Sequence, residues 1–105
     1  MPAMRIVGRR YDTLEPVAVD IDDGRISAIS AASPLIASER LPWLTPGFVD
    51  LQVNGFGGRA FNDPALTGED VLRISCTLDR FGVTSYCPTV TTDSRGALLQ
   101  AMTTL

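Results

Sequence analysis

Residues 48–105 predict a strand, a helix, a second strand and a second helix, joined by short links. Phe48–Val53 and Val83–Cys87 are the two strands, and Pro88 ends the second of them. A connection that leads through a helix from one strand to the next implies parallel strands and a right-handed crossover. This part of the chain therefore predicts an α/β fold, and Asp93 is expected to cap its second helix.

The segment that begins at Thr67 carries the signals of an amphipathic helix. Thr67 and Asp70 form a variant of the capping box. The Thr67 hydroxyl accepts a hydrogen bond from the third helical amide, and the Asp70 carboxylate accepts one from the amide of the cap residue. Gly82 is expected in the left-handed conformation that ends the helix. Apolar residues at helical spacing define one face of it: Val71, Ile74, Leu78 and Phe81.

The first third of the chain predicts β structure. Met4–Val7 is a short apolar run, and Pro16–Ile21 alternates, with Val17, Val19 and Ile21 on one face. Asp22-Asp23-Gly24 then predicts a tight turn into a return strand, Ile26–Ser30, because glycine tolerates the positive φ that such a turn requires. Ala31–Arg40 reads as a loop, and Leu41–Thr45 as a short strand.

A Pro46-Gly47 break separates the two patterns. We therefore expect residues 1–45 to form a β module and residues 46–105 to open an α/β sheet or barrel. Two parallel strands leave wide unpaired edges and much uncovered apolar surface. The fold is accordingly expected to continue beyond Leu105, the alternative being a small complete domain with a frayed terminal helix.

Composition excludes several kinds of chemistry. The 105 residues include no His, nine Lys plus Arg and twelve Asp plus Glu, for a net charge of −3. Without His, this chain alone can build neither a Ser-His-Asp or Cys-His catalytic unit nor a His-based zinc site. Its acidic balance and scattered arginines argue against nucleic-acid binding.

The remaining compositional signals concern compartment. Cys76 and Cys87 do not form a C-x-x-C pair, and we expect both to be reduced and buried. The start of the chain lacks the apolar region of a signal peptide. No apolar run approaches the roughly 18 residues of a membrane helix. A cytoplasmic protein without membrane contact is therefore expected.

The strand at Phe48–Val53 carries an unusual polar face. Alternation places Asp50, Gln52 and Asn54 on one side and Val49, Leu51 and Val53 on the other. Periodicity alone favours the solvated face of an antiparallel strand. A barrel strand is the other interpretation, with its polar end directed into an active site. The crossover that follows favours this second interpretation, because parallel strands are usually covered on both faces.

The glycine-rich segment Gly55–Ala60 formally matches the dinucleotide fingerprint G-x-G-x-x-A. That motif needs a helix to begin within the glycine loop, whereas here the predicted helix begins only at about Thr67. We therefore interpret Asn54–Pro64 as a flexible loop. Its Arg59 could meet an anion, although an exposed loop arginine is commoner.

Other residues are weaker candidates. Asp50 could act as a base, but an Asp in a strand is more often a hydrogen-bond anchor. Thr89, Thr91 and Thr92 follow a strand end, where a barrel binds ligand, yet threonines there often serve as caps. Trp43 and Tyr86 are expected in the core.

Two motifs resemble a known family. PGFVDLQVNGFGG (Pro46–Gly58) and GVTSYCPTVTTD (Gly82–Asp93) are similar to the N-acetylglucosamine-6-phosphate deacetylases of the amidohydrolase superfamily. The hairpin DDGRISAI (Asp22–Ile29) is like the N-terminal β-sandwich of that superfamily. The resemblance implies the first two β/α units of a (β/α)₈ TIM barrel, preceded by part of a small β-sandwich.

The implied reaction is hydrolysis of the acetamide of N-acetylglucosamine 6-phosphate to glucosamine 6-phosphate and acetate, in amino-sugar catabolism. A divalent metal ion, zinc or similar, is implied for the intact family member. In the family, a Glu and His residues of later strands hold the metal, and the catalytic Asp comes from the last strand. No position of this chain matches them, so we expect it alone to bind no metal and to be inactive.

Gln52 and Asn54 stand where many amidohydrolases have His-x-His. A neutral amide is a far poorer ligand than imidazole for a transition metal. The resemblance therefore implies a single-metal site, with Gln52 and Asn54 shaping the substrate pocket by hydrogen bonding.

Two alternatives remain open. One is another amidohydrolase, such as a cyclic-amide hydrolase or a deaminase, and the other is a non-catalytic small α/β interaction domain. The partner implied for the intact enzyme is a small-molecule amino-sugar phosphate, with a homo-oligomer possible at full length.

Overall fold

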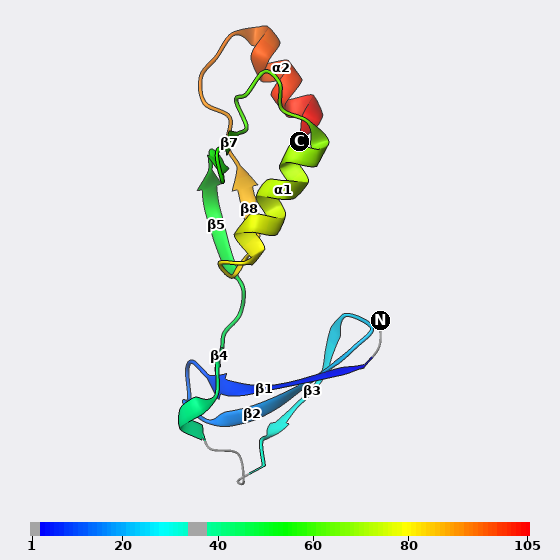
Figure 1. Cartoon of the computed structure of the whole chain (residues 1–105), viewed down its shortest axis with the longest axis vertical. Coiled ribbons are helices and arrows are strands. Elements are labelled where there is room, and N and C mark those ends of the chain that lie inside the picture. Colours follow the sequence, from blue (N-terminus) through cyan, green and yellow to red (C-terminus); the bar gives the residue numbers. More distant parts are fainter. Residues whose placement is uncertain (1–2, 34–37) are drawn as a thin grey trace. The chain divides into compact units, whose positions relative to one another are not determined.

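The structure is a computed structural model that describes residues 3–33 and 38–105 (Figure 1). The chain divides into two compact units, Met1–Pro46 and Gly47–Leu105. The division falls one residue after the boundary expected from the Pro46-Gly47 break. Residues 34–37 of the predicted loop Ala31–Arg40 lie outside the described residues, and Ser38–Arg40 forms a short 3₁₀ helix, η1.

The first unit is built on a four-stranded sheet with the order β3-β2-β1-β4. β1 pairs antiparallel with β2, and β2 pairs antiparallel with β3, whereas β4 runs parallel to β1. The central position of β2 explains why Val17, Ala18 and Val19 are all buried. The strands are β1 (Met4–Arg10), β2 (Pro16–Asp22), β3 (Arg25–Ala31) and β4 (Trp43–Leu44).

The predicted hairpin is confirmed. Asp22 pairs with Arg25, and the two residues between them have positive φ, 47° at Asp23 and 74° at Gly24. Two consecutive positive φ values match the twist of the flanking strands. The turn chemistry therefore sets the pairing next to the turn, and an irregularity between Asp20 and Ile21 shifts the register farther along the strands.

One face of the first sheet forms an apolar groove of about 440 Å³. Val17, Val19 and Ile21 line it together, as their alternation predicted, and Ile26 and Ile29 of β3 join them. Trp43, expected in the core, is instead 57% exposed. It lies on a two-residue strand at the edge of the sheet, and the guanidinium of Arg9 sits 5.3 Å from its ring centroid.

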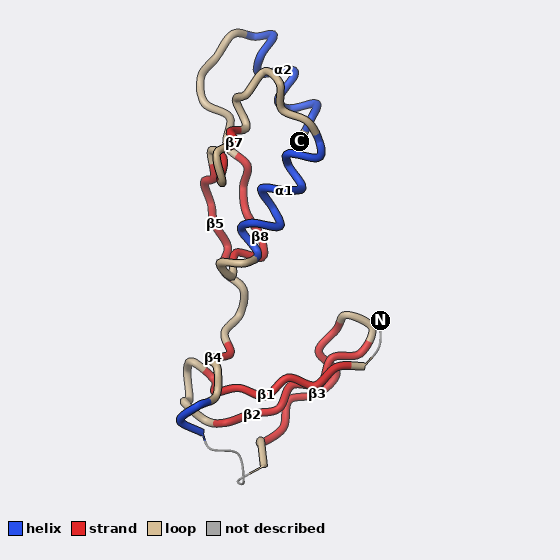
Figure 2. Tube along the Cα trace, viewed as in Figure 1, coloured by secondary structure: helices blue, strands red, loops and turns tan. Residues whose placement is uncertain are grey.

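The second unit contains the predicted strand–helix–strand–helix order. β5 and β8 pair in parallel, with α1 as the crossover between them (Figures 1 and 2). The elements are β5 (Phe48–Val53), α1 (Gly68–Asp79), β8 (Val83–Pro88) and α2 (Arg95–Thr104).

The core of this unit lies between the sheet and α1. Tyr86 of β8 stacks on Phe61, with ring centroids 6.0 Å apart. Its hydroxyl lies 2.9 Å from the Ser75 hydroxyl of α1, so its polar end also has a partner. Tyr86 therefore packs at the core, as expected. The buried cluster consists of Val53, Phe61, Leu66, Ile74 and Leu78.

The helix signals were largely correct. The capping box of Thr67 and Asp70 is present, and Gly82 has a φ of 81° two residues after the C-cap, Arg80. Phe81, expected on the buried face, follows the helix end, is exposed, and makes an edge-to-face contact with Phe56.

The cap of α2 and the two cysteines differ from expectation. Ser94, not Asp93, is the N-cap of α2, and its side chain accepts from the Ala97 amide at 3.2 Å. Cys76 and Cys87 are free, as expected, but both are exposed rather than buried. Cys87 directly follows Tyr86, whose side chain takes the core side of β8, so alternation directs the thiol away from the core.

The core of the second unit gives a direct stability test. Ile74 is 1% exposed and Leu72, on the same helix, is 66% exposed. We expect Ile74→Ala to lower the free energy of unfolding by about 2–5 kcal/mol, because it removes buried apolar contacts and leaves a cavity. Leu72→Ala is the matched control, with an expected change below about 1 kcal/mol. Urea unfolding followed by helical circular dichroism makes the comparison, and equal losses for the two variants would contradict this core.

Candidate site at the carboxyl end of the parallel strands

Gln52 and Asn54 lie at the carboxyl end of β5. Val53 between them is buried in the core cluster, whereas Gln52 and Asn54 are exposed. Because neighbouring residues of an extended strand point to opposite faces, Gln52 is directed away from the core and α1. Ligands of α/β sheets bind outside the carboxyl ends of the strands. The two amides thus share the end of the sheet where a ligand is expected.

Of the three apolar residues that alternation placed on one side of β5, only Val53 is buried. Val49 is 63% exposed and Leu51 is 77% exposed. The register with β8 shifts between Asp50 and Val53. At this irregularity the Asp50 carboxylate accepts from the Gln52 amide at 3.0 Å, so Asp50 is a hydrogen-bond anchor that shapes the backbone before the site.

Two backbone hydrogen bonds tie the end of β5 to segments that follow it. The Thr89 amide donates to the Val53 carbonyl at 2.8 Å, and the Phe61 amide donates to the Asn54 carbonyl at 2.9 Å. Asn54 therefore sits at a junction of two chain segments. Its main chain is held on one side by a residue that is itself fully buried, Phe61.

The predicted flexible loop Asn54–Pro64 contains a small hairpin instead. β6 (Gly55–Phe56) and β7 (Arg59–Ala60) pair antiparallel across Gly57 and Gly58. These glycines have φ values of 61° and 80°, the two positive angles of a tight hairpin turn. The glycines that suggested flexibility thus build an ordered structure beside the site.

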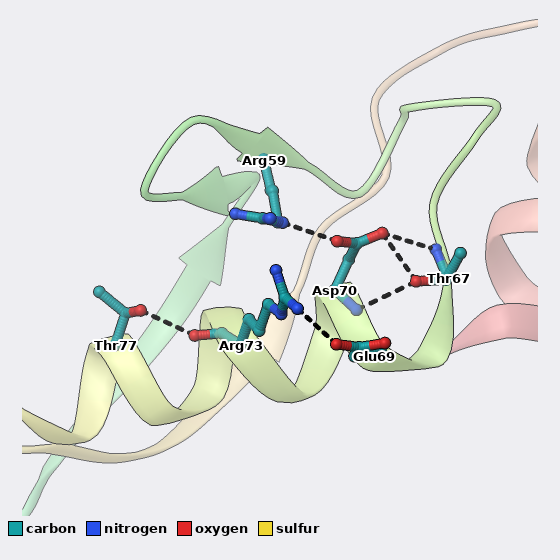
Figure 3. Close-up of polar contacts among 6 residues, drawn as sticks. All are labelled: Arg59, Thr67, Glu69, Asp70, Arg73 and Thr77. Carbon is teal, nitrogen blue, oxygen red and sulfur yellow. Dashed lines mark hydrogen bonds and ion pairs between the residues drawn. The ribbon is translucent and has the colours of Figure 1, made fainter.

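Arg59 connects this hairpin to α1 (Figure 3). Its Nε donates to Asp70 Oδ1 at 2.6 Å. Asp70 Oδ2 accepts from the Thr67 hydroxyl at 2.7 Å and from the Thr67 amide at 3.1 Å. One carboxylate therefore caps the helix and holds the hairpin, so the arginine considered for an external anion is paired within the chain.

Asn62 was not singled out by the sequence analysis, yet it bonds to the loop after β8. Its side-chain amide contacts both backbone polar groups of Thr91, 29 residues away. No motif or periodicity signalled this contact, because asparagine in a polar segment is usually solvated or part of a turn.

The described residues do not supply a ligand set for a divalent metal. Gln52 and Asn54 offer neutral amide oxygens, and the Asp50 carboxylate is hydrogen-bonded to the backbone. Within residues 3–33 and 38–105, no three His, Cys, Asp or Glu side chains gather into a cluster that could hold an ion. What this face offers is hydrogen-bond donors and acceptors, which suit binding and orientation of a polar ligand.

The fold is that of an α/β protein, with a mostly antiparallel sheet in one unit and a parallel pair of strands joined by a helix in the other. Its candidate site consists of amide side chains at the carboxyl end of a parallel strand. The chain is 37% identical over 93 residues to the N-acetylglucosamine-6-phosphate deacetylase of Haemophilus influenzae, covering 83% of this chain and 24% of that protein. It also matches the crystal structure of N-acetylglucosamine-6-phosphate deacetylase from Pasteurella multocida, with a TM-score of 0.72 and 26% identity, over 96% of this chain and 29% of that one. No family model matches the chain.

Over most of its length, the chain is therefore similar to N-acetylglucosamine-6-phosphate deacetylases in sequence and in backbone. It spans about a quarter of the length of the curated relative, 24%. Among the described residues, no helix is both long and apolar enough to cross a membrane.

The Arg59–Asp70 pair predicts a specific acid response. Hydrogen bonds from Arg59, then from the Thr67 hydroxyl and amide, lower the pKa of Asp70 from 3.8 to about 2. A carboxylate with a lowered pKa stabilises the fold above its unfolded pKa, and this contribution is lost as the pH falls from about 4 towards 2. We expect Asp70→Asn to remove this part of the acid dependence of the unfolding free energy, measured by urea unfolding across that range.

Thr77→Val is the control for this measurement. It removes a hydroxyl from the same helix that bonds only to the Arg73 carbonyl in Figure 3. An unchanged acid dependence in Asp70→Asn would show that Asp70 does not carry this contribution.

Proposed function

We propose that this chain is the N-terminal part of an N-acetylglucosamine-6-phosphate deacetylase of the amidohydrolase superfamily. The intact enzyme would hydrolyse the acetamide of N-acetylglucosamine 6-phosphate, releasing glucosamine 6-phosphate and acetate in the cytoplasm. The observation that carries this proposal is the likeness of most of the chain, in sequence and in backbone, to proteins named as this deacetylase.

In this proposal β5 with α1 and β8 with α2 are the first two β/α units of a (β/α)₈ barrel. The compact unit Met1–Pro46 is part of a β-sandwich. The parallel pairing of β5 with β8 across a crossover helix supports the barrel. The sheet formed by β1 to β4, with its apolar groove, supports one half of a sandwich whose groove face packs on further strands.

We assign Gln52 and Asn54 to shaping the substrate pocket. Both are exposed at the carboxyl end of a parallel strand, and each carries a donor and an acceptor in one amide group. Such groups suit the hydroxyl and acetamide groups of an amino sugar. The divalent metal of the proposed enzyme would be held by side chains that this chain does not supply, and it would contribute Lewis-acid chemistry at the acetamide.

The test is a chimera in which this chain replaces the matching residues of the Haemophilus influenzae deacetylase. We expect the chimera to release acetate from N-acetylglucosamine 6-phosphate. We expect Gln52→Leu and Asn54→Leu each to lower kcat/KM about fivefold, since a hydrogen bond to a neutral group contributes about 1 kcal/mol. Thr103→Val, which removes an exposed hydroxyl from α2, is the control and should leave kcat/KM unchanged.

The other outcomes separate the alternatives. A folded chimera that hydrolyses dihydropyrimidines but not the amino-sugar phosphate would support a different amidohydrolase. A folded chimera without either activity, together with cooperative unfolding of the monomeric 105-residue chain, would support a non-catalytic domain.

For the chain alone, we expect no acetate release from N-acetylglucosamine 6-phosphate when zinc is added. No position matches the family's metal ligands or catalytic Asp, and the described residues hold no cluster able to bind an ion. Turnover above the blank by the purified chain would contradict this expectation.

A further inference from the structure

Asn62 makes a reciprocal contact with the backbone of Thr91. The Thr91 amide donates to Asn62 Oδ1 at 2.7 Å, and Asn62 Nδ2 donates to the Thr91 carbonyl at 3.1 Å. A carboxamide has an acceptor and a donor side by side, like a peptide group. The side chain of Asn62 thus pairs with Thr91 as a neighbouring strand would.

These contacts allow only one orientation of the amide. Turning it over would set the NH₂ group against the Thr91 amide and the oxygen against the Thr91 carbonyl, losing both bonds. Nδ2 also lies 3.5 Å from the Asp93 carboxylate, which favours the same orientation. The contact therefore specifies asparagine: Asp lacks the donor, and Leu lacks both groups.

Each of the two residues in this contact directly follows a residue that packs in the core. Phe61, immediately before Asn62, is fully buried. Val90, immediately before Thr91, packs against the same cluster of buried residues. Because each partner is already fixed by its neighbour, forming the two bonds orders little additional chain.

The contact lies beside the residues assigned to the pocket. Phe61 holds the Asn54 carbonyl, and Thr89 holds the Val53 carbonyl. The Asn62–Thr91 contact is thus the second link, after Thr89–Val53, between the chain around the end of β5 and the segment after β8. Without it, the segments at Asn62 and Thr91 would be joined only by the packing of Phe61 and Val90 and by the Thr89–Val53 hydrogen bond.

We propose that Asn62 is a positioning residue of the pocket, which acts through Thr91 and Asn54 without contacting the substrate. This inference rests on the proposed function, because it assumes that the carboxyl end of β5 and β8 faces the substrate. Binding groups must be held in register with the reacting bond, and a misplacement of about 1 Å can lower the rate about 100-fold.

The test combines amide exchange in the 105-residue chain with kinetics of the chimera. In Asn62→Leu, we expect the Thr91 amide to exchange at least about fivefold faster, since a hydrogen bond contributes about 1 kcal/mol. We expect kcat/KM to fall about tenfold or more. Asn62→Asp is the second variant: it keeps the acceptor but sets an oxygen against the Thr91 carbonyl and the Asp93 carboxylate. Its Thr91 amide should therefore exchange at a rate between that of the parent chain and that of an unprotected amide, which tests the contact even if Asn62→Leu fails to fold. Thr103→Val, remote from this contact, should change neither quantity.

Each outcome decides a separate point. Unchanged Thr91 exchange in Asn62→Leu, or exchange in Asn62→Asp as fast as in an unprotected amide, would overturn the contact. Faster exchange with unchanged kcat/KM would overturn the positioning role. An inactive parent chimera would contradict the proposed function, and the positioning role with it, while the exchange measurement still decides whether the contact forms in the chain itself.

Discussion

β5 and β8 run parallel, and two adjacent parallel strands need a crossover that returns the chain to the start of the second strand. Here α1 is that crossover, and the cluster around Phe61 and Ile74 joins the helix to the sheet. The pairing also brings both carboxyl ends to one end of the sheet, where Gln52 and Asn54 flank the buried Val53. An antiparallel arrangement would separate these ends, and no common site would form.

The segments at that edge are held by polar contacts as well as by packing. The Arg59–Asp70 ion pair fixes the glycine-built hairpin to the start of α1, and Asn62 fixes the segment after the hairpin to the loop after β8. Both contacts are partly or wholly exposed, so their contribution to stability is modest compared with burial of the core. Their main effect is geometric, because they limit where the loops beside the two amides can lie.

Local signals in the sequence predicted the secondary structure well where one residue type has one physical role. Asp23-Gly24 specified a hairpin turn, Thr67 with Asp70 specified a capping box, and β5 was predicted at its observed bounds. The errors arose where tertiary context decides. Trp43 is exposed because it lies on a two-residue strand at the edge of its sheet, and Cys87 is exposed because it alternates with Tyr86 on β8.

The site could be predicted only in part for the same reason. The sequence identified the polar side chains at the end of β5 and the anchor role of Asp50, but not the Asn62 contact across 29 residues. The most direct test is a crystal structure of the chimera with glucosamine 6-phosphate bound. We expect side-chain atoms of Gln52 and Asn54 within about 3.5 Å of the sugar or of groups that contact it. A ligand bound elsewhere, with both amides in open solvent, would contradict the account.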